Sequence, residues 1–484
     1  MSLSYFVNEE SVNTPYAIND YKIHKFDDEL VLITTEHGSW IVLNKQEFNL
    51  LRSGNLTQDL NLFTALEDKG IIVTEKNFDR VAQMYKERFH YLFNGITLHI
   101  VVPTLRCNLK CVYCGASSVP LNAKGFDMDE KTAKAVVDFM FQTPSKFFTI
   151  EFQGGEPLVN FPIVQYIIEY AKKKNESKIC EGELWRGKKS LTFRLVSNLT
   201  LMNTDILDYL VKNKVSICTS LDGPEWLHNK NRIYTKAGSY NTVTYWIDYI
   251  KKELGLQCNA IPTITKYSLP YAKEIVDEYL KHGLNQIKMR PLNIAGAAIN
   301  AWERIGYTSE QYVSFWKEFI EYIFKLNKRG VNVQDIDTVF MLRRMITLKP
   351  PFNACLGAPC GACLIQTAYN QWGDVYTCDE GRSCEIFKLG NVKKDNYKKI
   401  FSSSEALNFI GLTSCVSAIC DACEWHPYCS PCLVSTYGDQ KNLISKMPSD
   451  FLCGIRGNQV EYLFKKLIFS EEEKRILLNW LSEI

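Results

Sequence analysis

Residues 106–114 read R-C-N-L-K-C-V-Y-C, and the interpretation of the whole chain starts from them. They place three thiols, Cys107, Cys111 and Cys114, at the spacing C-x3-C-x2-C. Gaps this short allow one tight loop to direct three thiolates at a single compact centre. In a four-iron cluster that only carries electrons each iron has a Cys ligand, so three thiols leave one iron open for a substrate or cofactor. A zinc site is the alternative, although zinc favours C-x2-C pairs and four protein ligands.

The size and charge of the chain limit the classes of function. Its 484 residues predict roughly two to four domains, and its 46% hydrophobic and 23% charged residues are typical of a soluble globular protein. The 56 Lys and Arg residues nearly balance the 54 Asp and Glu residues, which gives no reason to expect nucleic acid or a membrane as a partner. The first residues lack an export signal and no long apolar stretch follows, so we expect a cytoplasmic protein.

The chain contains 17 Cys residues, and most of them fall in two places. Three stand in the opening motif, and eleven lie between Cys355 and Cys453. In a reducing cytosol such thiols are more often metal ligands than disulfides. Cys218 and Cys258 lie in strand-like apolar runs, where a buried thiol needs no functional role, and Cys180 stands alone.

Residues 96–300 alternate between strand-like and helix-like patterns. The predicted strands cover residues 96–102, 148–153, 191–198, 215–221, 258–265 and 286–292. Predicted helices lie between them at residues 128–141, 162–174, 204–213, 240–254 and 270–283. Six strand–helix units predict an α/β fold in which a parallel sheet curls into a partial (β/α)6 barrel, with function at the C-terminal ends of the strands. The opening Cys motif follows the first strand at that end.

Four segments flank this barrel. Residues 1–95 predict a small α+β domain, because short strand patterns are followed by two helical stretches. The strands are expected at residues 21–26, 30–35 and 39–44. Residues 301–350 predict a helical bridge, 351–456 form the Cys-rich region, and 457–484 predict a C-terminal packing helix.

A Gly-Gly-Glu-Pro sequence, residues 154–157, follows the second predicted strand. Gly154 and Gly155 allow the backbone to approach a ligand closely. Together with the Cys motif, this sequence resembles the radical S-adenosylmethionine (radical SAM) superfamily, in which the open iron of a four-iron cluster binds the amino and carboxylate groups of S-adenosylmethionine. The resemblance implies that Gly154, Gly155 and Glu156 bind the methionine part of this cofactor.

The resemblance also assigns residues at the next strand ends. It implies that Asn198 and Ser220 contact the ribose and methionine of the cofactor. It further implies that Arg232 pairs with the cofactor carboxylate, a role that suits a planar guanidinium. Asp222 precedes Gly-Pro and is interpreted as a residue that shapes the turn.

The Cys-rich region resembles the SPASM extension of radical SAM peptide maturases, which carries two auxiliary four-iron clusters. The resemblance rests on C-x9-G-x4-C from Cys363 to Cys378 and on C-x2-C-x5-C-x2-C from Cys420 to Cys432. The ligands that it implies for the first auxiliary cluster are Cys360, Cys363, Cys378 and Cys432. Those that it implies for the second are Cys420, Cys423, Cys429 and Cys453.

The Cys-rich region also departs from the family pattern. The last gap before Cys432 is two residues where the family usually has three, and Cys355 is an alternative to Cys360 as the upstream ligand. Cys384 and Cys415 have no place in the pattern and are free thiols, alternative ligands or substrate-facing groups. Zinc ribbons are the alternative for the whole region, because C-x2-C recurs in it, but C-x9-G-x4-C is not a ribbon spacing.

Two residues near these thiols carry further expectations. Asp379 directly follows Cys378. In the related sulfatase-maturing enzymes an Asp at the matching place is the general base, so the resemblance implies that Asp379 accepts a proton as the substrate radical is oxidised. A structural hydrogen-bond acceptor is the alternative. His426, between Cys423 and Cys429, is interpreted as a loop histidine rather than a ligand.

The N-terminal domain is similar in pattern to the peptide-binding domain of enzymes that modify ribosomally made peptides. There the leader of the precursor adds a strand to a sheet edge. A structural cap is the alternative. In overall layout the chain is similar to the maturase of the His-Xaa-Ser repeat peptide system.

The resemblance implies a function and its cofactors. An external one-electron donor such as flavodoxin or ferredoxin reduces the cluster, and S-adenosylmethionine is cleaved to methionine and a 5′-deoxyadenosyl radical. That radical takes a hydrogen atom from a side chain of a precursor peptide. The chain is thus expected to hold three four-iron clusters (4Fe-4S) and S-adenosylmethionine. The alternatives are a formylglycine-forming sulfatase maturase and a non-catalytic zinc or iron–sulfur scaffold.

Overall fold

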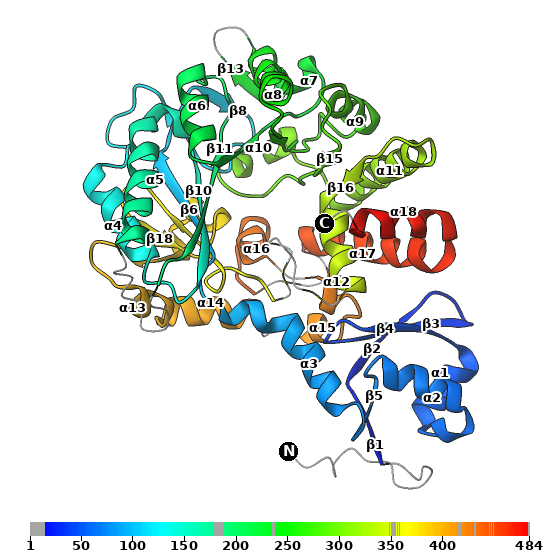
Figure 1. The fold of residues 1–484 in the computed structure, drawn as a ribbon. Helices are drawn as coiled ribbons and strands as arrows, with labels where there is room; N and C mark the ends of the chain where they lie inside the picture. Colours follow the sequence, from blue (N-terminus) through cyan, green and yellow to red (C-terminus); the bar gives the residue numbers. More distant parts are fainter. Residues whose placement is uncertain are drawn as a thin grey trace.

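The structure is a computed structural model of the chain (Figure 1). It describes residues 15–177, 187–234, 238–347, 349, 355, 357, 359–414, 418–429, 432–444, 446, 448 and 450–482. Cys180 and Cys415 lie outside the described residues. An N-terminal unit projects from a larger body that contains the main sheet and the Cys-rich region (Figure 1).

The main sheet has eight strands in the order β14-β12-β11-β10-β6-β17-β18-β19. Its first five strands are parallel and belong to the predicted barrel: β6 (Leu98–Thr104), β10 (Phe147–Gly154), β11 (Ser190–Val196), β12 (Val215–Thr219) and β14 (Asn259–Ala260). The predicted α/β fold with a partial barrel is therefore confirmed.

The last two barrel strands are shorter than predicted. The fifth ends at Ala260, because Pro262 has no N–H to donate to a neighbouring strand. The sixth, β15 (Gln286–Ile287), pairs with β16 (Gln334–Asp335) and not with β14. A single parallel bridge between Thr263 and Arg290 connects the fifth and sixth segments.

Helices cover one face of the sheet. The five predicted helices are present as α4 (Glu130–Met140), α5 (Phe161–Glu176), α6 (Thr204–Lys212), α8 (Tyr240–Leu254) and α9 (Ala272–Lys281). Along β10, Ile150 and Phe152 are fully buried in the core with α4 and α5, while Glu151 points to the opposite, concave face. Within the described residues of the predicted barrel region, α7 (Glu225–Asn231) and α10 (Ala297–Ile305) are helices that were not predicted.

The Cys-rich region extends the barrel sheet. Its strand β17 (Gln366–Tyr369) lies parallel to β6, and β18 (Asp374–Tyr376) and β19 (Lys388–Asn391) continue the sheet with antiparallel pairing. Ile100 of β6 shares one apolar cluster with Cys363 and Cys378. At β6, Cys-rich segments thus cover the concave face of the sheet. The polar side chains of this face lie on the next strands, β10 and β11.

The N-terminal unit contains the three predicted strands as an antiparallel sheet, β2 (Tyr21–Lys25), β3 (Leu30–Thr35) and β4 (Trp40–Asn44). The predicted helices follow as α1 (Lys45–Ser53) and α2 (Leu60–Asp68). The strand β1 (Tyr16–Ile18) pairs with β5 (Ile72–Thr74), and α3 (Phe78–Phe89) leads into the barrel. Asn44 and Glu47 form a capping box that fixes the start of α1.

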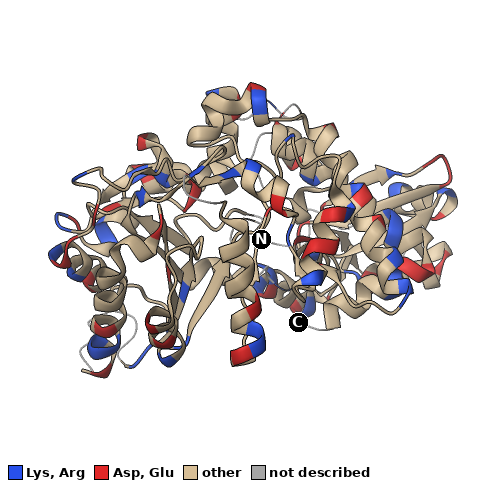
Figure 2. Ribbon diagram, turned by 90° about the horizontal axis from the view of Figure 1, so that it is seen from above, with Lys and Arg blue, Asp and Glu red and all other residues tan. Residues whose placement is uncertain are grey.

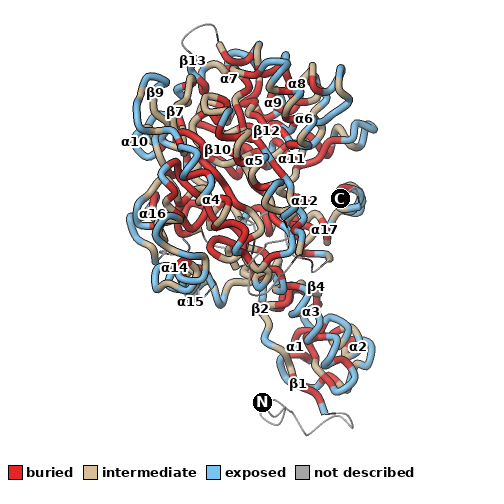
Figure 3. Tube along the Cα trace, turned by 60° about the vertical axis from the view of Figure 1, so that its left-hand side comes forward, coloured by how far each residue is buried: buried red, intermediate tan, exposed pale blue. Residues whose placement is uncertain are grey.

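Helices near the C-terminus pack between the body and the N-terminal unit (Figures 1 and 3). The predicted helical bridge is present as α11 (Ser309–Lys328) and α12 (Ile336–Ile346). The single helix expected over 457–484 is wrong: α17 (Phe451–Phe469) and α18 (Glu471–Ser482) are separate helices. Asp450 caps α17 by accepting from the N–H groups of Leu452 and Cys453, so the expected boundary at 456 falls inside this helix.

The surface shows no dominant sign of charge. Lys and Arg alternate with Asp and Glu around the described part of the molecule (Figure 2), as the net charge of +2 suggests. Of the helices that the structure describes, none has the length and apolar character needed to cross a membrane.

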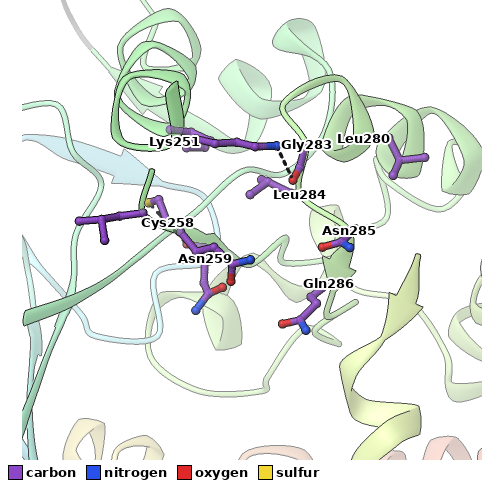
Figure 4. A pocket seen from close by; sticks show the side chains of 11 residues that line it. Lys251, Cys258, Asn259, Leu280, Gly283, Leu284, Asn285 and Gln286 are labelled. Atoms are coloured by element: carbon purple, nitrogen blue, oxygen red, sulfur yellow. Dashed lines mark hydrogen bonds between the residues drawn. The ribbon is translucent and has the colours of Figure 1, made fainter. Parts of the chain in front are cut away.

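A cavity of about 320 Å³ lies between α8 and α9, beside the amino ends of β14 and β15 (Figure 4). Lys251 reaches across it and donates from Nζ to the carbonyl oxygen of Gly283 at 3.0 Å. Because the opening Cys motif follows the carboxyl end of β6, this cavity lies at the wrong ends of the strands to belong to the predicted site.

Candidate functional site

The loop of residues 105–118, here called the thiol loop, follows β6 directly. Arg106 anchors its start through two hydrogen bonds to the Asp127 carboxylate, from Nε at 2.8 Å and from Nη2 at 2.7 Å. Its middle strand β8 (Leu109–Cys111) pairs with β13 (Arg232–Tyr234), which places Cys111 opposite Arg232. The thiol loop is thus held at its start and at its middle by the protein itself.

The three thiols of the thiol loop lie near one another and near hydrogen-bond donors. The Cys107 sulfur accepts from the Leu109 N–H at 3.4 Å and from Asn198 Nδ2 at 3.8 Å. Burial raises the pKa of Cys107 and that of Cys111 to about 12, and the neighbouring thiolates add to both shifts. Such thiols ionise when a positive centre compensates them, so this donor set fits an iron–sulfur cluster.

Asp222 joins the fourth barrel strand to the thiol loop. Its carboxylate, fully buried, accepts from Tyr113 Oη at 2.6 Å, from Arg232 Nε at 3.1 Å and from the Thr263 N–H at 3.1 Å. The third nitrogen of the guanidinium, Nη1 of Arg232, lies 3.9 Å from the Cys111 sulfur. Asp222 therefore does more than shape a turn: it fixes the Arg232 side chain against the thiol loop.

Replacing Asp222 with Asn should destabilise the protein by about 3–5 kcal/mol, because it leaves the buried Arg232 charge uncompensated. Tyr113→Phe removes only one hydrogen bond to a charged group, worth about 1.5–3 kcal/mol. Urea unfolding of both variants and of the unmodified protein measures the difference. Equal losses would contradict a buried ion pair at Asp222.

Two glycines form a close approach between β10 and the thiol loop. A Cβ at Gly155 would lie 2.3 Å from the Arg106 carbonyl oxygen and 2.5 Å from that of Leu105. Gly154 has φ +126° and would place a Cβ 2.6 Å from the Thr104 carbonyl oxygen. Both positions therefore need glycine for the backbone itself, whether or not a ligand binds there.

Glu156 has its hydrogen bonds inside the protein. Its buried carboxylate accepts from the N–H groups of Leu158 and Asn198 and from Ser197 Oγ, at 3.0, 2.8 and 2.7 Å. Burial raises the pKa of Glu156 to about 7, although these three donors act in the opposite direction. The side chain ties the end of β10 to the end of β11.

Asn198 and Ser220 occupy the places that the sequence predicted, at the carboxyl ends of β11 and β12. Asn198 donates from Nδ2 to Asn108 Oδ1 at 3.1 Å as well as to the Cys107 sulfur. Ser220 is half-buried directly after β12. Of the six predicted cofactor residues, all but Ser220 make close contacts with neighbouring residues at this one edge of the sheet.

A first set of thiols, here called the first Cys group, comprises Cys355, Cys360, Cys378 and Cys432. Burial, and then the thiolates of Cys355, Cys432 and Cys360, raise the pKa of the Cys378 thiol. Burial raises the pKa of Cys363, and the neighbouring thiolate of Cys360 raises it further. The sequence left Cys355 and Cys360 as alternatives, whereas the structure brings both toward Cys378.

A second set, here called the second Cys group, comprises Cys420, Cys423, Cys429 and Cys453. Burial, and then Cys429, Asp450, Cys420 and Cys423, raise the pKa of Cys453 to about 12. This is the same set of four thiols that the sequence predicted.

Among the described residues, no three His, Cys, Asp or Glu side chains are gathered closely enough to hold a metal ion in the present structure.

Arg456 lies between the two Cys groups. It stands on α17 one turn after Cys453, and its Nη2 donates to the Cys355 carbonyl oxygen at 3.0 Å. The thiolates of Cys429, Cys432, Cys355 and Cys360 all raise its pKa, against the effect of burial. One guanidinium thus faces thiols of both groups, a feature that no spacing in the sequence revealed.

Asp379 lies at the concave face of the barrel. Arg382 donates from Nε to its Oδ1 at 2.8 Å. Burial raises the pKa of Glu151 on β10, although a hydrogen bond from Gln153 lowers it. The negative charge of Asp379 raises the pKa of Glu151 further, so the two carboxylates lie near each other. The carboxylate next to Cys378 therefore faces the polar side of the barrel.

Comparisons with known proteins agree with this arrangement. Residues 101–277 match the model of the Radical SAM superfamily. An uncharacterized protein of Methanocaldococcus jannaschii is 25% identical over 64% of this chain and 93% of its own length. A cysteine-type anaerobic sulfatase-maturating enzyme of Clostridium novyi is 24% identical over 69% of this chain and 87% of its own length.

Two solved structures share the fold over most of the chain. The anaerobic sulfatase-maturating enzyme anSMEcpe, solved with bound AdoMet, has a TM-score of 0.67 at 20% identity, covering 80% of this chain and 98% of its own. Streptococcus suis SuiB, bound to precursor peptide SuiA, has a TM-score of 0.53 at 14% identity, covering 90% of this chain and 99% of its own. The matched residues, the partial barrel and the thiol loop at its edge together show that this chain contains a radical SAM domain.

Proposed function

We propose that the protein is a radical SAM enzyme that modifies a side chain of a ribosomally made precursor peptide. The observation that carries the proposal is the thiol loop, whose three thiols lie at the carboxyl edge of the barrel beside Gly154, Asn198 and Arg232. A four-iron cluster and S-adenosylmethionine bound there would supply a 5′-deoxyadenosyl radical for hydrogen abstraction.

The residues around the thiol loop bind and orient these groups. Cys107, Cys111 and Cys114 would hold the cluster, and the backbone at Gly154 and Gly155 would receive the methionine part of the cofactor. Arg232 already pairs with Asp222, so it holds the thiol loop and offers its remaining N–H groups to the cofactor carboxylate. Asn198 and Ser220 would contact the ribose and methionine of the cofactor. Glu156 acts through the hydrogen bonds that join β10 to β11.

The two Cys groups support two auxiliary four-iron clusters. The second Cys group supplies Cys420, Cys423, Cys429 and Cys453. For the first, Cys378 and Cys432 are joined by Cys360, with Cys363 and Cys355 as the candidates for the fourth ligand. Asp379, beside Cys378, is the proposed acceptor of the proton that the substrate releases on oxidation.

Anaerobic reconstitution should load about twelve iron and twelve sulfide per chain, because three separate sets of thiols are present. Iron and labile-sulfide assays on the reconstituted protein measure this number. A preparation that saturates near four iron would remove both auxiliary clusters and leave a simpler radical SAM enzyme. Bound zinc without sulfide would instead favour the non-catalytic scaffold.

A peptide substrate is supported by the structural neighbours, since SuiB was solved with its precursor peptide and anSMEcpe with peptides. The N-terminal unit would capture the leader at an edge of its small sheet. The His-Xaa-Ser repeat system remains our specific proposal for the peptide. The test is to incubate the loaded enzyme, an electron donor such as flavodoxin or ferredoxin, S-adenosylmethionine and a His-Xaa-Ser peptide, and to analyse the peptide by mass spectrometry.

A second candidate is formylglycine formation on a sulfatase. It is favoured by the sulfatase-maturating relatives and by the carboxylate of Asp379 on the concave face. The same incubation with a Cys-containing sulfatase peptide separates the two candidates, because formylglycine formation converts the Cys side chain to an aldehyde that hydrazide reagents label. Modification of the repeat peptide without labelling of the sulfatase peptide would favour the first candidate.

A further inference from the structure

The segment between Cys423 and Cys429 is bound along its whole length by residues far away in the sequence. Two side-chain hydrogen bonds join it to the N-terminal unit: His24 Nδ1 lies 2.9 Å from Glu424 Oε1, and His426 Nδ1 lies 3.2 Å from Glu36 Oε2. Burial alone would raise the pKa of Glu36, but His426 and Lys22 lower it to about 2. The buried Thr34 hydroxyl donates to the Glu424 carbonyl oxygen at 3.0 Å.

Two buried arginines hold the second half of this segment. Arg88 of α3 and Arg344 of α12 both donate to the Pro427 carbonyl oxygen, and Arg344 Nη1 donates to that of Tyr428 at 2.8 Å. Tyr428 in turn donates from Oη to the Gly38 carbonyl oxygen at 2.9 Å. Gly38 has φ +92°, and a Cβ there would lie 2.6 Å from Arg88 Nη1, so this turn needs glycine to admit the guanidinium.

The N-terminal sheet is buried on both faces where it meets this segment. Along β3, Val31 and Ile33 belong to the apolar core of the N-terminal unit, while Leu32 between them belongs to the core of the body. Trp40 of β4 donates from Nε1 to the Met345 carbonyl oxygen at 2.8 Å and packs edge-on against Phe464 of α17. A module that only captures peptides and hangs from a linker would have a solvated face here.

We propose that the N-terminal unit positions residues 424–428 and thereby sets the separation of the Cys423 and Cys429 thiols. Each of these five residues contacts the N-terminal unit or its helix α3: Glu424 and Trp425 contact His24, His426 contacts Glu36, Pro427 contacts Arg88, and Tyr428 contacts Gly38. The N-terminal unit thus supports the loop that carries two thiols of the second Cys group, whether or not it also captures a peptide. The iron measurement described below rests on the proposed function, whereas the positioning of residues 424–428 does not.

The test compares two variants of the full chain with a matched control. His24→Ala combined with Glu36→Gln removes the two carboxylate–histidine contacts, whose side chains are partly exposed, and with them the ion pair of Glu36 with Lys22. Arg88→Met removes the buried guanidinium. The control is Arg80→Met on the same helix, since Arg80 donates to the carbonyl oxygens of Glu67 and Asp68 inside the N-terminal unit.

Amide hydrogen exchange of the iron-free protein is the first readout. We expect residues 424–429 to exchange about tenfold faster in both loop variants and at the unmodified rate in the control. The second readout is iron after reconstitution, which should fall by about a third in the loop variants, while cleavage of S-adenosylmethionine at the thiol loop is retained.

Unchanged exchange at residues 424–429 in both loop variants would overturn the proposal. A rise spread evenly over the chain would also overturn it, because it would show general destabilisation. If the unmodified protein itself holds only about four iron, the proposed auxiliary clusters fail, and the exchange rates still decide whether the N-terminal unit positions this segment.

Discussion

Replacing Cys107, Cys111 and Cys114 together with Ala should abolish reductive cleavage of S-adenosylmethionine and leave roughly two thirds of the iron. The three thiols lie on the thiol loop, whereas the first and second Cys groups have their own ligands on other elements. The measurements are 5′-deoxyadenosine formed with a strong reductant and iron per chain after reconstitution.

Cys218 and Cys258 provide the matched control for this experiment. Both thiols lie at the fourth and fifth barrel strands, away from the three sets of thiols, and burial raises the pKa of Cys218 to about 12. A variant with Ala at both positions should keep its iron and its cleavage activity. Continued formation of 5′-deoxyadenosine by the triple variant would show that the thiol loop does not hold the catalytic cluster.

Replacing Gly155 with Ala should reduce cleavage of S-adenosylmethionine by at least about a hundredfold. A Cβ at Gly155 overlaps the carbonyl oxygens of Leu105 and Arg106, both backbone atoms at the start of the thiol loop. Separating them moves the Cys107 end of the loop by a fraction of an ångström or more, and misplacements of about 1 Å can cost a hundredfold in rate. Single-turnover formation of 5′-deoxyadenosine measures the effect.

Gly115 is the control glycine for this substitution. It lies on the same thiol loop, beside Cys114, and a Cβ there would meet no heavy atom within 4 Å. Gly115→Ala should therefore keep most of the cleavage activity. Equal losses in the two variants would show that the loop tolerates no added methyl group, and the backbone contact at Gly155 would lose its special role.

The sequence predicted the barrel well because its strands and helices have strong local patterns. The first four strands and all five expected helices lie within a few residues of their predicted bounds. The fifth strand was overestimated because Pro262 interrupts an apolar run, and the sixth because its only strand partner among the described residues, β16, is two residues long. At the C-terminus the helical pattern was recognised, but the break at Ser470 was not.

The parts of the site that the sequence missed depend on contacts between distant residues. Asp222 was interpreted as a turn residue because nothing in its neighbourhood announces that Arg232, ten positions later, folds back against it. His426 was interpreted as a loop histidine, and its partner Glu36 lies 390 residues away. No motif in the sequence singles out Arg456, and only the fold places it between two sets of thiols.

The position of β6 in the main sheet has a consequence for how the chain is made. This strand is the first of the barrel, with β10 on one side and β17 on the other. During synthesis β10 follows soon after β6, but the opposite edge stays unpaired until residues 366–369 leave the ribosome. An unpaired apolar strand edge is a site for aggregation, so the nascent barrel depends on protection, by chaperones or by rapid elongation, until the Cys-rich region arrives.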